Sequence, residues 1–284
     1  MKMTSIAGCC TLAAVLLAPV LVRGETPEQA FAKGEAALAK ADFAAAMASF
    51  AAAAKADLDN REYLQHYLMV RRVMDLRARL ESAETPRQWE QIAAALRAFY
   101  MGEQLYSEAL ALDKKIHERI NTATSAMMLA DTQLAMNLNA DAVRLLSSVE
   151  KDKSTSATRA LLGIALARTG KTAEAKQLAS SVTLPEEGDP GLYYLAARLQ
   201  ALTGDAAKAS DLLKRGFEQT PPSQLDGFKA HAKANPDLAS LAAAPTFAAA
   251  LAVQSKIAES KCSGGSSCAN CPMKGKCPSS QGQK

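Results

Sequence analysis

The chain has 284 residues, of which 49% are hydrophobic and only 5% aromatic, and its formal net charge is +4. Abundant alanine without long β-branched runs favours closely packed helices and almost no sheet. A small net charge with no basic stripe gives no indication of a nucleic-acid partner.

Residues 1–24 carry the pattern of a secretory signal peptide. Lys2 precedes an apolar run from Ile6 to Val22, and Gly24 offers a small residue at the cleavage site. This pattern predicts an exported bacterial protein, periplasmic or secreted. The alternative is an uncleaved membrane anchor facing the periplasm, because the run approaches spanning length.

The mature chain opens with a helix-start signature at 26–29, where Thr26 is followed by Pro27 and, three residues on, by Gln29. A first helix containing Gly34, a turn at 42–43 and a second helix containing Phe50 form one helical hairpin. Such a hairpin has an apolar face that a neighbouring hairpin must cover.

Residues 61–82 form a longer amphipathic helix that is rich in arginine. The arginine cluster either binds an acidic partner or is a solvated helix face. A second hairpin starts near Trp89, with a longer turn expected near Gly102. A third occupies about 122–153, where Asn137 to Asn139 replace the turn glycine, since Asn tolerates the left-handed conformation.

The clearest internal repeat is at 156–223. Thr169-Gly170-Lys171-Thr172-Ala173-Glu174-Ala175 is followed 34 residues later by Thr203-Gly204-Asp205-Ala206-Ala207-Lys208-Ala209. The period, the turn glycine and the small residue after it resemble the tetratricopeptide repeat. The resemblance implies an all-α solenoid of helical hairpins over residues 25–223, with about five units.

The resemblance also implies a protein or peptide partner on the concave face formed by the first helix of each hairpin. The family's groove positions fall on Ile164, Arg168, Tyr194 and Arg198. Two arginines beside a tyrosine are suited to an acidic segment or a C-terminal carboxylate. The alternative is that these are ordinary surface residues.

Residues 224–260 are expected to form a helical cap over the last hairpin, punctuated by Asn235-Pro236 and Ala244-Pro245. An irregular cysteine-rich tail follows at 261–284, with its cysteines at Cys262, Cys268, Cys271 and Cys277. Three chemistries compete there: two disulfides, a four-thiolate site for zinc or another thiophilic metal such as Cu(I), and an iron–sulfur cluster. The spacing and an unfolded export route argue against the cluster.

No catalytic motif accompanies these features. His117 is followed by Glu118, but residue 121 is Asn, so the second ligand of a zinc-protease motif is missing. The sequence therefore predicts a non-enzymatic interaction scaffold in an exported compartment. The alternative is a metal-binding or thiol-redox accessory protein whose chemistry resides in the tail.

Overall fold

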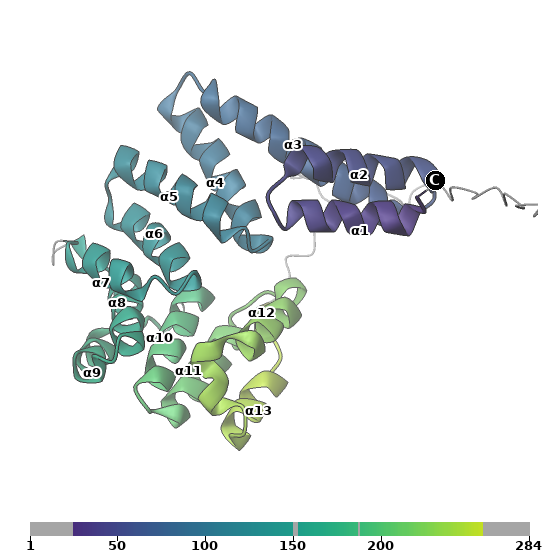
Figure 1. The fold of residues 1–284 in the computed structure, drawn as a ribbon. Helices are drawn as coiled ribbons and strands as arrows, with labels where there is room; N and C mark the ends of the chain where they lie inside the picture. The colour runs from purple at the N-terminus through teal and green to yellow at the C-terminus, as the bar shows by residue number, and fades with distance from the viewer. Residues whose placement is uncertain (1–24, 150–152, 187, 258–284) are drawn as a thin grey trace, which may run out of the picture. The chain divides into compact units, whose positions relative to one another are not determined.

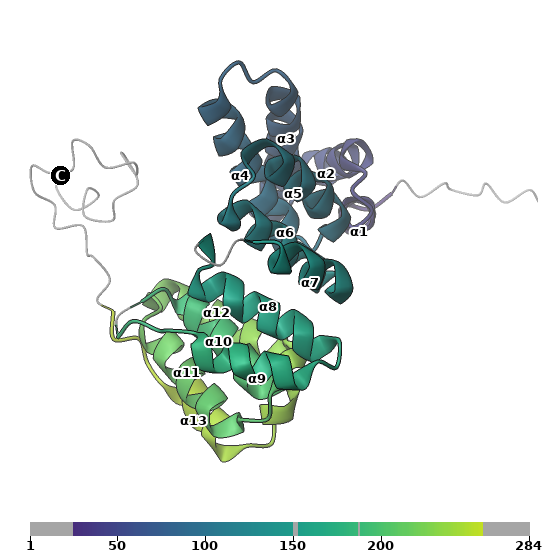
Figure 2. The ribbon, with the colours of Figure 1, turned by 90° about the vertical axis from the view of Figure 1, so that its left-hand side faces the viewer.

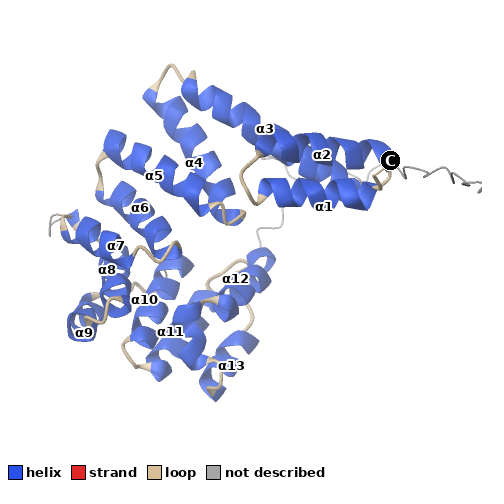
Figure 3. Ribbon diagram, in the orientation of Figure 1, coloured by secondary structure: helices blue, strands red, loops and turns tan. Residues whose placement is uncertain are grey.

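The computed structural model describes residues 25–149, 153–186 and 188–257, and this part of the chain is built from helices joined by short loops, without a strand (Figures 1 and 3). The predicted all-α architecture of consecutive helical hairpins is therefore confirmed. Both the predicted signal peptide and the four tail cysteines lie outside the described residues. No helix in the described ranges is long and apolar enough to cross a membrane.

The chain divides into two compact units, Met1–Asp75 and Leu76–Lys284. This boundary falls inside one helix, α3 (Arg61–Glu81). It was not anticipated from the sequence, which places a single solenoid over residues 25–223. The expected boundary near residue 223, between solenoid and cap, stays a prediction.

The first unit is a helical hairpin followed by the start of α3. The hairpin consists of α1 (Pro27–Leu38) and α2 (Phe43–Ala56). The predicted capping box is present, because Thr26 Oγ1 accepts from the Gln29 N–H at 3.3 Å and Gln29 Oε1 accepts from the Thr26 N–H at 3.0 Å. Phe50, which is fully buried, packs its ring where Gly34 lacks a side chain.

The second unit continues the hairpin pattern. After the end of α3, its helices are α4 (Pro86–Gly102), α5 (Tyr106–Ile120), α6 (Ala123–Ala135), α7 (Asn139–Ser147), α8 (Ser156–Arg168), α9 (Thr172–Ser181), α10 (Pro190–Leu202), α11 (Ala206–Glu218), α12 (Pro222–Ala234), the 3-10 helix η2 (Pro236–Leu241) and α13 (Pro245–Ala252). The pairs α4–α5, α6–α7, α8–α9 and α10–α11 are hairpins, and α8 contacts both α6 and α10 (Figure 2). We call α4, α6, α8 and α10 the first-helix layer.

All the hairpins of the described residues share one turn geometry. Each has a residue of positive φ in the turn, and the next N–H donates to the carbonyl five residues earlier at 2.8–3.0 Å. The turn residues are Ala41, Gln104, Asn137, Gly170 and Gly204. The last four are 33 or 34 residues apart, so the period seen clearly at 156–223 extends back to α4.

The expectation of a longer turn near Gly102 is wrong. Gly102 is the last residue of α4, and the turn follows it with Gln104 at φ 56°. At Asn137 the prediction of a left-handed turn residue is confirmed, with φ 58°. The hairpins thus keep one backbone geometry while the residue that adopts it changes.

The end of the second unit is covered by the elements after α11. α10 contacts η2, and α11 contacts α13. Leu238, Leu241 and Phe247 from these elements belong to the same buried cluster as Tyr193 and Phe217 of the last hairpin. This arrangement is the helical cap that an exposed terminal repeat requires.

Candidate functional site

An acid of η2 lies between two arginines of the first-helix layer. Arg168 ends α8 and Arg198 lies in α10, so both side chains come from adjacent first helices. Arg168 Nε donates to Asp237 Oδ1 at 2.9 Å and Arg168 Nη2 to Oδ2 at 3.1 Å. Arg198 Nε donates to the same Oδ2 at 2.9 Å. The bidentate pair and the second guanidinium leave the Asp237 side chain only 4% exposed.

Arg168 extends this contact to the preceding hairpin. Its Nη1 donates to the backbone carbonyl of Leu134, in α6, at 2.7 Å. The backbone of Asp237 is fixed within the cap segment as well, since its N–H donates to Asn235 Oδ1 at 2.9 Å. One side chain therefore connects α6, α8 and the cap.

Tyr194 completes this cluster from α10. Its hydroxyl accepts a hydrogen bond from Asn235 Nδ2 at 2.7 Å, and the Arg198 guanidinium lies 5.6 Å from its ring centre. Burial raises the pKa of the Tyr194 phenol, and the positive charge of Arg198 opposes that rise. The phenol is consequently neutral at physiological pH and accepts a hydrogen bond from the cap.

Of the four predicted partner-binding residues, Arg168, Tyr194 and Arg198 are thus brought together at the cap, Arg168 is partly buried, and the other three are buried. Tyr194 is 7% exposed, Arg198 6% and Ile164 0%. Ile164 belongs to the core between α8 and its neighbours. The expectation that these three residues are accessible on the groove is therefore wrong. The cap segment with Asn235 and Asp237 covers Tyr194 and Arg198, and hairpin stacking covers Ile164. Binding itself stays a prediction.

Exposed polar groups remain beside the covered cluster. The His231 ring, on α12, lies 5.4 Å from the Tyr194 ring, centre to centre, and the residue is exposed. Asp131, on α6, pairs with Arg97 Nη2 at 3.5 Å and keeps a side chain 39% exposed. Desolvation lowers the pKa of His231 and Arg198 lowers it further, while the negative charge of Asp131 opposes both. The charge of Asp131 thus acts on His231, and we call these two residues the open pair.

A second buried ionic cluster joins α4, α5 and α6, and the sequence reasoning missed it. Asp113 is fully buried and accepts from Arg97 Nε at 2.8 Å and from Thr132 Oγ1 at 2.6 Å. Arg97 Nη2 also donates to the Met128 carbonyl at 3.0 Å. Burial raises the pKa of Asp113, and the hydrogen bond from Thr132 and the charge of Arg97 oppose it. Arg97 thereby ties one first helix to the next, as Arg168 does further along.

A signal for this cluster was present in the residue pattern. Asp113 falls on the same helix face as the buried Ala109, Leu112 and Ile116 of α5. A charged residue at a position of the apolar stripe is expected to have a buried partner. Its partner was not deducible from the pattern, because Arg97 lies in another helix.

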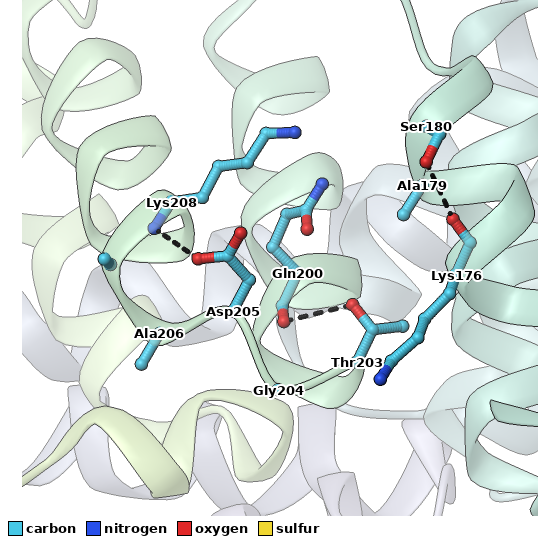
Figure 4. Close-up of a pocket in the computed structure, with 10 residues that line it drawn as sticks. Lys176, Ala179, Ser180, Gln200, Thr203, Gly204, Asp205, Ala206 and Lys208 are labelled. Carbon is cyan, nitrogen blue, oxygen red and sulfur yellow. Dashed lines mark hydrogen bonds between the residues drawn. The ribbon is translucent and has the colours of Figure 1, made fainter. Parts of the chain in front are cut away.

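A pocket with a volume of about 590 Å³ lies between α9 and the α10–α11 turn (Figure 4). Lys176 and Lys208 flank it in this view, with Gln200 between them. Asp205 in its wall already caps α11 by accepting from the Lys208 N–H at 3.0 Å. Ser180 likewise donates to its own helix, at the Lys176 carbonyl. The polar groups of this pocket mainly serve the helix ends that form it.

No group of three or more His, Cys, Asp or Glu side chains that would hold a metal occurs in the described ranges. The four cysteines predicted as disulfides or metal ligands lie beyond residue 257, outside those ranges.

Comparison with known proteins adds little to this description. No family model matches the sequence, and no curated protein matches it either. Among solved structures, the chain is similar to a tetratricopeptide repeat protein from Parabacteroides merdae ATCC 43184, with a TM-score of 0.41 and 14% sequence identity. The match covers 80% of this chain and 98% of that chain. The account of the fold rests on the hairpins and their shared turns.

Proposed function

We propose that the protein is a non-enzymatic interaction scaffold whose first-helix layer holds a peptide or protein segment. The observation that carries the proposal is that arginines of this layer pair with buried acids of the chain itself. Asp113 and Asp237, the buried acids, are both engaged by arginines that join one helix of the array to another. These groups hold a continuous surface rigid, as a scaffold requires, and are not presented to a substrate.

The arginine pair is already occupied from within the chain. Arg168 and Arg198 hold a carboxylate within the chain itself, so the geometry for gripping an acidic group is present. Because Asp237 fills this geometry, a partner segment would make its first contacts with the open pair, Asp131 and His231. The carboxylate of Asp131 favours a basic or hydrogen-bond-donating group of the partner there. We propose this neighbourhood as the entry point of the site.

Site-specific photo-crosslinking tests this proposal. A benzophenone amino acid at position 131 or 231 is expected to crosslink one and the same partner in the cells that produce the protein. The same group at the exposed Lys176, on α9 and therefore off the first-helix layer, is the matched control. Crosslinking of that partner at equal yield from position 176, or from none of the three positions, would overturn the proposal.

We further propose that the chain works in an exported compartment and that its four tail cysteines close two disulfides there. An even number of cysteines in an exported chain favours disulfides. A four-thiolate zinc or Cu(I) site is the alternative, since thiolates suit those metals.

Alkylation followed by mass spectrometry separates the two tail chemistries. Protein from its own compartment is expected to take up iodoacetamide at none of the four cysteines until a reductant is added, and at all four afterwards. Stoichiometric metal, with thiols released by a chelator alone, would replace the disulfide proposal by the metal site. Four thiols that react at once would contradict both.

A further inference from the structure

Exposed leucines gather at the start of α3. Among the described residues, Leu58 is 84% exposed, and Leu64 and Leu68 are each 47% exposed. Leu64 and Leu68 are four residues apart in a helix, so they are neighbours on one face. The opposite face of α3 is already buried through Tyr63, Val70 and Val73. This helix therefore presents apolar side chains on both sides.

Arginines bracket the two exposed leucines. At 100° per residue, Arg61, Arg71 and Arg72 project within about 80° of Leu64, on the same outer side of α3. All three are exposed, and in the part of the chain that the structure describes none of them forms an ion pair. We call Arg61, Leu64, Leu68, Arg71 and Arg72 the α3 outer face.

The bracketing arginines decide among the occupants of this face. A second copy of the chain, with its α3 antiparallel, would set Arg61 of each copy beside Arg71 and Arg72 of the other, and like charges in contact are unfavourable. A lipid surface demands a long apolar stripe, whereas this one spans little more than a turn and follows the acids Asp57, which is partly buried, and Asp59, which is exposed. An acidic amphipathic helix would cover the leucines with its apolar side chains and pair its carboxylates with the arginines.

We propose that the α3 outer face docks an acidic amphipathic helix of a partner protein. The leucines accept apolar side chains that the partner presents at i and i+4, and glutamates or aspartates on either side of them pair with the arginines. All residues of this surface precede Asp75 and so belong to the first unit, whereas the first-helix layer belongs to the second. The surface gives the scaffold a second binding site.

Fluorescence anisotropy with a designed probe tests the proposal on the mature full chain. The probe is a labelled 18-residue helical peptide with leucines along one stripe and glutamates beside it. We expect saturable binding that weakens about tenfold or more in Arg71→Glu/Arg72→Glu and in Leu64→Ser/Leu68→Ser, and that weakens with added salt. Arg87→Glu/Lys114→Glu, which reverses two exposed charges in the second unit, is the matched control and is expected to bind like the unaltered protein.

Each remaining outcome overturns the proposal. Equal binding of a peptide with lysines in place of the glutamates shows that charge does not select the partner, and unchanged binding in both test variants shows that the site is elsewhere. Binding to phosphatidylglycerol vesicles that the same variants abolish assigns the face to lipid. A dimer in sedimentation that Leu64→Ser/Leu68→Ser dissociates assigns it to a second copy. Far-UV circular dichroism confirms the fold of every variant, and position-131 crosslinking reads out the first-helix layer independently.

Discussion

Replacing Asp237 with alanine is expected to lower the free energy of unfolding by about 3–5 kcal/mol, the range seen when one partner of a buried ion pair is removed. The reason is that Arg168 and Arg198 would then face each other with no anion between them, while their side chains are only 14% and 8% exposed. Urea unfolding followed by circular dichroism, with the slope compared between variants, measures the change.

Two further variants separate the charge from the packing of η2. Asp226→Ala removes an exposed acid of α12 and is expected to change stability by less than about 0.5 kcal/mol. Replacing Arg168 and Arg198 by methionine in the Asp237→Ala background is expected to recover part of the loss, because no buried charge then lacks a partner. A loss in Asp237→Ala no larger than in Asp226→Ala would contradict this account.

The repeat turns show how far the sequence predicts the fold. Gly170, Gly204 and Asn137 were predictable turn residues, because glycine and asparagine adopt positive φ at low cost. Ala41 and Gln104 take the same conformation although their side chains disfavour it. At these two turns no glycine or asparagine marks the position, so the left-handed conformation could not be predicted from the turn residue.

In the candidate site, too, the sequence predicts which residues lie near one another but not which residues pair. The sequence brought Arg168, Tyr194 and Arg198 together on neighbouring first helices and identified the segment at 235–238 as part of a cap. That the cap supplies the carboxylate was not predictable, since Asp237 is 69 residues from Arg168 and 39 from Arg198. Local periodicity places residues on a face, but it does not say which distant acid closes over them.

Replacing Phe50 with alanine is expected to destabilise the first unit by about 3–5 kcal/mol, as for other buried aromatic truncations. Phe50 is fully buried, and its ring lies 5.3 Å from that of Phe31, centre to centre. Truncation leaves a cavity between α1, α2 and α3 that these helices cannot fill without moving. Thermal and urea unfolding by circular dichroism measure the loss. Leu58→Ala, which truncates a side chain 84% exposed in the same unit, is the matched control and is expected to change stability little.

Gly34 makes the Phe50 prediction sharper, because a Cβ there would lie 2.6 Å from the Phe50 ring. Gly34→Ala alone is expected to destabilise the protein, since the ring has to move. In the Phe50→Ala background the obstacle is gone, and alanine is the better residue within a helix by about 1 kcal/mol. The same substitution is then expected to stabilise. A penalty of equal size in both backgrounds would show that Gly34 is required for some reason other than the close approach of Phe50.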